Sequence, residues 1–282
     1  MVWIIKMELN KIYQIKHELW LKILFTSFSI KDEAIKNELY EMATIEFRHM
    51  KWLSNRLKDE NIEYDYEKNI IDLKKNSSFE YFEYLTLEIQ NTMKLYDIKD
   101  AMFNRMQSDE YFFITKLNKF LKDESNNMPI SAFNKQRVYK NKNLDKESTD
   151  ALTRFLFEET YKEYELILVY AYMQNYTNDI VQYNIYQDLI DESQYHLKCF
   201  GNMLSEMGIL AIPRTVIKEI YKKDDIKKFL LNGIEEEKMA KEECLKLSQA
   251  VKDEELAKFF EFINFQENYH IELMQKAVNK IV

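Results

Sequence analysis

Glu46-Phe47-Arg48-His49 places a histidine three residues after a glutamate, and Glu267-Asn268-Tyr269-His270 repeats this spacing. A close variant, Glu192-Ser193-Gln194-Tyr195-His196, has one residue more between the two. Side chains three or four positions apart share one face of a helix. A carboxylate and an imidazole on one face can hold a metal ion between them. Three of the four histidines of this chain therefore indicate helical metal motifs.

The composition favours helix along nearly the whole chain. Its 282 residues include only three Gly and two Pro, whereas Leu, Lys, Glu and Met are frequent. This length allows two domains, each with its own core. The net charge of −8 argues against nucleic acid as the main partner, because phosphate binding needs a basic surface.

Several features of the sequence indicate a cytoplasmic protein. No apolar run reaches the length of a membrane span, so no membrane partner is expected. The apolar stretch at residues 1–5 is too short for a signal peptide. The two cysteines, Cys199 and Cys244, fit a reducing compartment, and we expect them to be small core residues.

Helical periodicity divides the chain into two similar halves. We expect one domain at residues 1–123, a linker at 124–149 with a basic stretch at 135–146, and a second domain at 150–282. Each half is predicted to contain two helical hairpins. They span 7–29 with 31–58, 78–97 with 99–122, 150–175 with 179–207, and 226–251 with 254–281.

A long connection separates the two predicted hairpins of each half. About 20 residues, at roughly 3.3 Å each, can run the whole length of a 25-residue helix. The second and third helices of each half can therefore be parallel. This pattern predicts an all-α fold made of two ferritin-like four-helix bundles in tandem.

Every predicted helix carries an acid within its apolar stripe. A lone buried carboxylate is very costly unless it is paired or bound to metal. The acids also lie nearly symmetrically about the hairpin turns, since 28 positions separate Glu18 from Glu46 and 30 separate Glu237 from Glu267. We therefore expect the acids of each half to meet at one level of the bundle.

These motifs resemble those of the ferritin-like di-metal carboxylate proteins, the superfamily of rubrerythrins, manganese catalases and aldehyde-deformylating oxygenases. The resemblance covers nearly the whole chain except the linker. It implies that each half supplies Glu, Glu-x-x-His, Glu and Glu-x-x-His to a pair of metal ions. The implied ligands of the second half are Glu163, Glu192, His196, Glu237, Glu267 and His270, and those of the first are Glu18, Glu46, His49, Glu88 and Glu110.

The first half departs from this pattern at its last motif. Phe113 stands where the second histidine is expected, so one metal would lose its nitrogen ligand. The first site would then be mononuclear, weak or empty. His17 points about 100° away from Glu18 around the helix and is expected at the surface.

The second half departs at its first Glu-x-x-His motif. If His196 takes the usual position, Ser193 falls where glutamate belongs, and a π-bulge in the helix would restore Glu192. Tyr170 and Tyr195 lie close to the ligand positions. They are either redox or proton-donating groups or ordinary core tyrosines.

The resemblance also implies a chemistry. Carboxylates with one imidazole per ion favour iron(II) or manganese(II) over copper or zinc. In the superfamily such metal pairs react with dioxygen or hydrogen peroxide, which implies an oxidoreductase acting on either molecule, with a small apolar substrate as a further partner. Two alternatives stay open, namely a metal- or iron-handling protein without turnover and a helical scaffold that has lost its metals. Association into a homodimer stays open as well.

Overall fold

The chain is described by a computed structural model that covers residues 2–66, 71–97, 99–130, 139, 142, 144–212, 214–223 and 225–281, with backbone only for residues 2–7. Its helices are α1 (Val2–Ser29), α2 (Glu33–Asp59), α3 (Ser78–Met93), α4 (Ala101–Leu121), η1 (Glu124–Asn126), α5 (Lys146–Tyr176), α6 (Ile180–Glu206), α7 (Lys218–Tyr221), α8 (Ile226–Ala250) and α9 (Glu254–Lys280). Apart from one isolated bridge between Ser77 and Pro129, all regular structure in these ranges is helical. The predicted all-α class is confirmed.

None of the helices in the described ranges combines the length and the apolar character that crossing a membrane requires. Most of the basic stretch at 135–146 lies outside the described residues. Helix α5 begins at Lys146 rather than at residue 150, and α3 ends at Met93 rather than at residue 97. The short helices η1 and α7 were not predicted.

Side-chain caps explain where several helices begin and end. The side chains of Asp32, Asp100 and Asp253 accept hydrogen bonds from the first turns of α2, α4 and α9. The Ser77 hydroxyl likewise accepts from the Glu80 N–H at 3.3 Å. After α6, Gly208 adopts a φ of 78°, a left-handed conformation that glycine tolerates best and that stops the helix.

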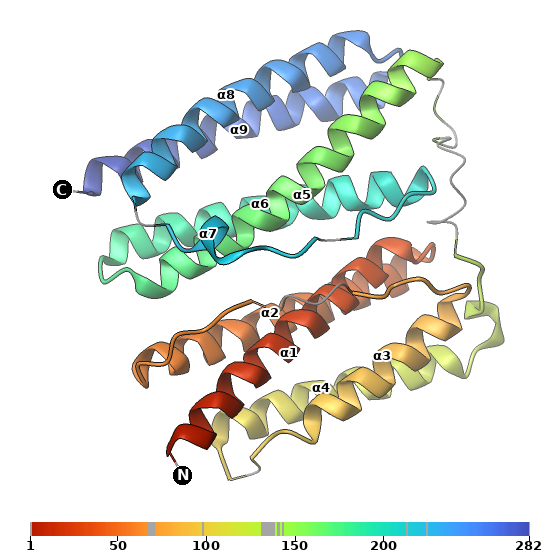
Figure 1. Cartoon of the computed structure of the whole chain (residues 1–282). Coiled ribbons are helices and arrows are strands. Elements are labelled where there is room, and N and C mark those ends of the chain that lie inside the picture. Colours follow the sequence, from red (N-terminus) through yellow and green to blue (C-terminus); the bar gives the residue numbers. More distant parts are fainter. Residues whose placement is uncertain are drawn as a thin grey trace. The chain divides into compact units, whose positions relative to one another are not determined.

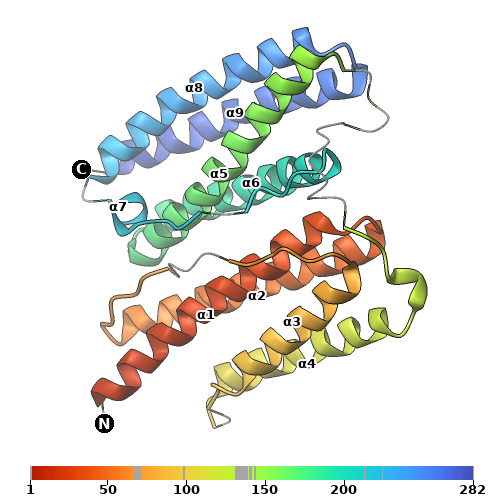
Figure 2. The same ribbon diagram turned by 45° about the vertical axis from the view of Figure 1, so that its right-hand side comes forward.

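The chain forms two compact units. Unit 1 comprises Met1–Asn134 with Ile212–Val216, and unit 2 comprises Lys135–Ala211 with Ile217–Val282. Within unit 1, α1 and α4 each pack against both α2 and α3. Within unit 2, α5 and α9 each pack against both α6 and α8, and α8 lies beside α9 along most of its length (Figure 1 and Figure 2). The helix contacts in each unit therefore close a ring of four.

Contacts along the helices give their directions. In unit 1, Lys22 of α1 pairs with Glu88, whereas Lys16, further back on α1, lies over the ring of Tyr96, further along the chain. Helix α3 therefore runs antiparallel to α1. In unit 2, α5 and α8 are antiparallel for the same reason, because the Tyr170 ring contacts Phe229 whereas Lys162 approaches Glu237.

Each hairpin is itself antiparallel, so the second and third long helices of each unit run in the same direction. The chain must return to the opposite end of the unit between them. The connection that makes this return follows α2 at Glu60 in unit 1 and follows α6 at Met207 in unit 2. This is the arrangement that connections of about 20 residues allow.

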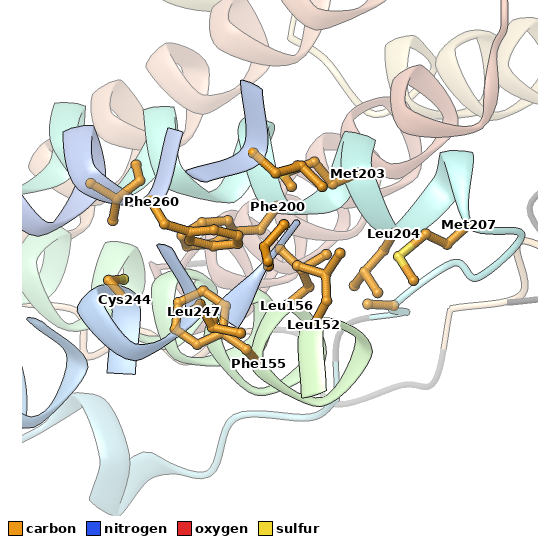
Figure 3. Close-up of a cluster of buried hydrophobic side chains, with 14 residues drawn as sticks. Leu152, Phe155, Leu156, Phe200, Met203, Leu204, Met207, Cys244, Leu247 and Phe260 are labelled. Carbon is orange, nitrogen blue, oxygen red and sulfur yellow. The ribbon is translucent and has the colours of Figure 1, made fainter. Parts of the chain in front are cut away.

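All four long helices of unit 2 contribute to an apolar cluster. Figure 3 shows Leu152 and Phe155 of α5, Phe200 of α6, Leu247 of α8 and Phe260 of α9 pointing toward one another. The Phe155 ring meets those of Phe200 and Phe260 edge-on, with centroids 5.7 and 5.5 Å away. On α9 the cluster ends at Ile263, about one turn before Glu267, and this packing fixes the four helices next to the buried acids.

This cluster predicts a large loss of stability on truncation. Phe260→Ala removes a fully buried ring and should lower the free energy of unfolding of unit 2 by about 3–5 kcal/mol. Phe265→Ala, on the same helix but 73% exposed, should change it by about 0.5 kcal/mol or less. Urea unfolding followed by circular dichroism compares the two, and equal effects would contradict the assignment of the core.

Candidate metal centre

Among the residues that the structure describes, two buried groups of histidine and glutamate lie close enough to hold a metal ion, one in each unit. In unit 2 the group consists of His196, Glu267 and His270, and in unit 1 of Glu46, His49 and Glu110. In each group the potential ligand atoms lie within 4.8 Å of one another, and all six residues are buried.

Helices α5, α6 and α9 bring acids and imidazoles together in unit 2. The Glu163 Oε1 lies 2.9 Å from the Nδ1 of His196, and Glu267 Oε1 lies 3.8 Å from that same nitrogen. The other Glu267 oxygen, Oε2, is 3.0 Å from the Nδ1 of His270. Glu267 therefore lies between the two imidazoles, with Oε1 facing His196 and Oε2 facing His270.

The His196 ring is oriented from its other side. Its Nε2 lies 3.2 Å from the Oε1 of Gln266, an acceptor, so Nε2 carries the proton and donates. Histidines that bind metal commonly donate their second N–H to such a partner, which fixes the ring and its tautomer. The Nδ1 of His196 is therefore the atom that faces the acids.

Helix α6 resolves the choice between Glu192 and Ser193. All of Ile180–Glu206 is α-helical, so α6 does not use a π-bulge to turn Glu192 inward. Ser193 is buried, yet Glu192 also reaches inward, with Oε2 3.8 Å from the Nε2 of His270. Glu192 therefore approaches His270 on α9 rather than His196 on its own helix.

Helix α8 adds Glu237 to the acids of unit 2. Its side chain is buried and faces that of Glu267. In the described part of the chain, Lys162 is the lysine that approaches this group, with Nζ 3.9 Å from oxygens of both Glu237 and Glu159. These distances are too long for hydrogen bonds, so the lysine lies at the edge of the group.

Burial and neighbouring charges shift the pKa values of unit 2 in both directions. Despite desolvation, the charge of His196 lowers the pKa of Glu163, and desolvation lowers that of His270. Desolvation raises the pKa of Glu159 to about 7, and desolvation with the charge of Glu267 raises that of Glu237 well above its ordinary value. Desolvation also raises the pKa of Glu267. For His196, desolvation is outweighed by the charge of Glu163, and its pKa rises to about 10. A cation near Glu159, Glu237 and Glu267 would offset the desolvation of these three carboxyl groups.

The partners of the buried atoms test whether a metal fits. Among the described residues, one carboxylate oxygen each of Glu163, Glu192 and Glu267 is buried without a hydrogen-bond partner, and so is the Nε2 of His270. Leaving a buried polar atom unpaired costs free energy. Oxygen and imidazole donors that converge in this way fit a metal ion.

A pocket of about 290 Å³ reaches this group from the surface of unit 2. Leu166 and Val169 of α5 and Phe229 and Gly233 of α8 line it, with Lys162 and Glu237 among its walls. Because Glu237 lines the pocket and also faces Glu267, the pocket gives a small molecule a path to the acids.

In unit 1 a lysine occupies the centre of the corresponding group. Lys16 of α1 is fully buried, and its Nζ donates to Glu110 Oε1 at 2.6 Å, forms an ion pair with Glu46 and lies 3.2 Å from the Nδ1 of His49. Burial alone would lower the pKa of Lys16, but the charges of Glu110 and Glu46 outweigh it and raise the pKa. The sequence prediction missed this residue.

Neighbouring groups complete the polar centre of unit 1. The Tyr96 hydroxyl donates to Glu110 Oε1 at 2.6 Å, and the His49 Nε2 lies 3.1 Å from Asp109. Burial works to raise the pKa of Glu46, but Lys16 and His49 lower it to about 2. Burial raises the pKa of Glu110 to about 7 despite Lys16.

The structure does not bring Glu18 and Glu88 into the buried group of unit 1. Both pair with Lys22, Glu18 at 2.6 Å, and their side chains are 25% and 29% exposed. Of the predicted first-half ligands, the structure therefore gathers Glu46, His49 and Glu110 alone. Glu18 and Glu46 lie at nearly equal distances from the turn between their helices. This symmetry indicates how far along its helix each residue lies, but not the face of the helix on which its side chain lies.

The structure also places three other residues that the sequence analysis singled out, namely His17, Tyr195 and Tyr170. The expectation that His17 lies at the surface is wrong, since it is buried, and desolvation lowers its pKa to about 3. Tyr195 is 41% exposed and is therefore not a core tyrosine. Tyr170 is buried, its hydroxyl has no hydrogen-bond partner among the described residues, and desolvation with the charges of Glu237 and Glu163 raises its pKa.

No family model, curated protein or solved structure matches this chain. The chemistry of unit 2 and unit 1 therefore has to be inferred from their own residues.

The contact between Tyr96 and Glu110 predicts a measurable contribution to stability. Tyr96→Phe removes the hydroxyl that donates to a buried carboxylate, and should lower the free energy of unfolding of unit 1 by about 1–3 kcal/mol. Tyr111→Phe, at a tyrosine that is 59% exposed, is the matched control and should have no measurable effect. Equal denaturation midpoints for Tyr96→Phe and wild type would contradict this contact.

Proposed function

We propose that unit 2 is a carboxylate–histidine metal centre and that the chain is a non-haem iron or manganese oxidoreductase acting on dioxygen or hydrogen peroxide. One observation carries the proposal. Buried acids and imidazoles from four helices converge, several of their atoms lack partners, and Lys162 reaches only the edge of the group. The proposed ligands are Glu163, Glu192, His196, Glu237, Glu267 and His270.

The arrangement of the helices supports the ferritin-like part of this proposal. Rings of four helices, antiparallel within each hairpin and joined by a long return connection, are the topology of ferritin-like bundles. In such bundles the metal ligands project inward from all four helices. The proposed ligands of unit 2 come from α5, α6, α8 and α9, one or two from each.

When bound, an iron or manganese pair would pass electrons from an added reductant to dioxygen, or would accept and return electrons in the dismutation of peroxide. Residues around the proposed ligands would control access to the metal and donate hydrogen bonds near it. Leu166, Val169 and Phe229 give the access pocket an apolar wall, which favours small, weakly polar molecules. The Tyr170 hydroxyl is unpartnered near the acids and its pKa is raised, so it keeps its proton and can donate a hydrogen bond there.

Metal content tests the ligand set directly. Wild-type protein purified with iron(II) or manganese(II) should retain metal, and Glu267→Ala should lose it, because Glu267 contacts both imidazoles. Glu261→Ala, an exposed acid on the same helix, is the matched control and should retain the wild-type content. Elemental analysis and anomalous scattering at the iron and manganese edges provide the measurement. Unchanged metal content in Glu267→Ala would reject the site.

Turnover separates the oxidoreductase from its alternatives. The metal-loaded wild type should consume dioxygen, given a reductant, or hydrogen peroxide, and Glu267→Ala should not. Metal retention without consumption would instead identify a metal-handling protein. Absence of metal from wild type would identify a helical scaffold.

The pocket predicts a second effect on turnover. Leu166→Trp should fill part of the path to Glu237 and lower kcat/KM at least several-fold while leaving the metal content unchanged. Leu231→Trp, on α8 and 45% exposed, does not line the pocket and should match wild type. Steady-state rates with metal analysis on the same samples make the comparison. Equal rates in the two variants would exclude this route of access.

A further inference from the structure

The two units repeat one pattern of contacts. In unit 1, Lys16 lies 33 positions before His49 and contacts its Nδ1, and in unit 2, Glu163 lies 33 positions before His196 and contacts the same nitrogen. Lys16 of α1 therefore holds the place of Glu163 of α5. A cation stands in unit 1 where unit 2 has an acid.

The other sides of these histidines match as well. The Nε2 of His49 meets Asp109, and the Nε2 of His196 meets Gln266. The residue after each partner is a buried glutamate, Glu110 in α4 and Glu267 in α9. The main positions of the two groups thus correspond, with exchanges of Lys16 for Glu163, Glu46 for Ser193 and Phe113 for His270.

The Lys16 ammonium touches each member of the buried group of unit 1. It contacts Glu46, Glu110 and His49, the same three residues whose ligand atoms are close enough to hold an ion. A metal bound by these three would have to occupy the space of the Nζ atom. Phe113 also removes the nitrogen that His270 supplies in unit 2.

We propose that Lys16 takes the place of a metal ion in unit 1. Its ammonium supplies, from a side chain of the protein, the positive charge that balances the buried carboxylates. Unit 1 therefore folds without metal and binds none. Metal binding by this chain would then belong to unit 2 alone. Replacing Lys16 by an acid would restore the unit 2 pattern on α1 and create a metal site from Glu46, His49, Glu110 and the new carboxylate.

The first test counts metal in a chain whose unit 2 site is disabled. The Glu267→Ala variant is incubated with manganese(II) or with iron(II) under anaerobic conditions, desalted and analysed for bound metal. The expected result is no bound metal. Retained metal that is lost on adding Glu110→Ala would overturn the proposal, because unit 1 would then bind an ion beside Lys16.

The second test introduces Lys16→Glu into the Glu267→Ala chain. The expected result is about one metal ion per chain, lost again on adding Glu110→Ala, and a melting temperature that falls in chelator and rises with manganese(II). Lys11→Glu, at an exposed lysine on the same helix, should gain no metal and show no response to it. A Lys16→Glu chain that is folded but binds no metal would overturn the proposal.

A third variant covers the case in which Lys16→Glu does not fold. Lys16→Met leaves the carboxylates without their cation and should lower the melting temperature, whereas Lys16→Met with Glu46→Gln removes one of these charges and should recover part of the loss. No recovery would mean that Lys16 acts by packing rather than by charge, and would overturn the proposal. Because the first two tests use the Glu267→Ala background, their outcomes do not depend on whether unit 2 binds metal.

Discussion

The compensation of buried carboxylates is the constraint on which the rest of this structure depends. An acid inside a helical unit loses its hydration, and only a nearby cation, a proton or a set of hydrogen bonds can replace it. Glu46 and Glu110 in unit 1, and Glu163, Glu237 and Glu267 in unit 2, are all buried within apolar stripes. Each unit needs positive charge at its centre.

The two units meet this need differently. Unit 1 brings its own cation, since the Lys16 ammonium lies between Glu46 and Glu110 with Tyr96 donating from another side. Unit 2 has an excess of acids, and desolvation raises the pKa values of Glu237 and Glu267. A single exchange on the first long helix, lysine against glutamate, accounts for most of this difference.

The sequence predicted the helices well because apolar periodicity and scarce Gly and Pro leave few alternatives. It also placed Glu46, His49, Glu110, Glu267 and His270 correctly on inward faces, since each lies among apolar residues at helical spacing. Lys16 was missed because lysine usually extends to solvent, although its neighbours Ile12, Tyr13 and Trp20 form a buried stripe around it. The available signal was a shared spacing. Lys16 lies 33 positions before His49, and Glu163 lies 33 positions before His196. The sequence wrongly placed Glu18 in the buried group. Its distance from the turn indicates its position along the helix, but not the direction in which its side chain points around the helix axis.

This difference in charge balance also determines how each unit would respond to metal. An ion that binds the folded state and not the unfolded state stabilises the fold in proportion to its affinity and concentration. In unit 2 an ion would offset the desolvation of Glu237 and satisfy the unpartnered oxygens of Glu163 and Glu192, so metal binding and folding would be coupled there. In unit 1 the compensating charge is covalently part of α1 and enters the core as the chain folds. Its stability would therefore be independent of metal supply, and one unit of the chain would remain folded whether or not the other is loaded.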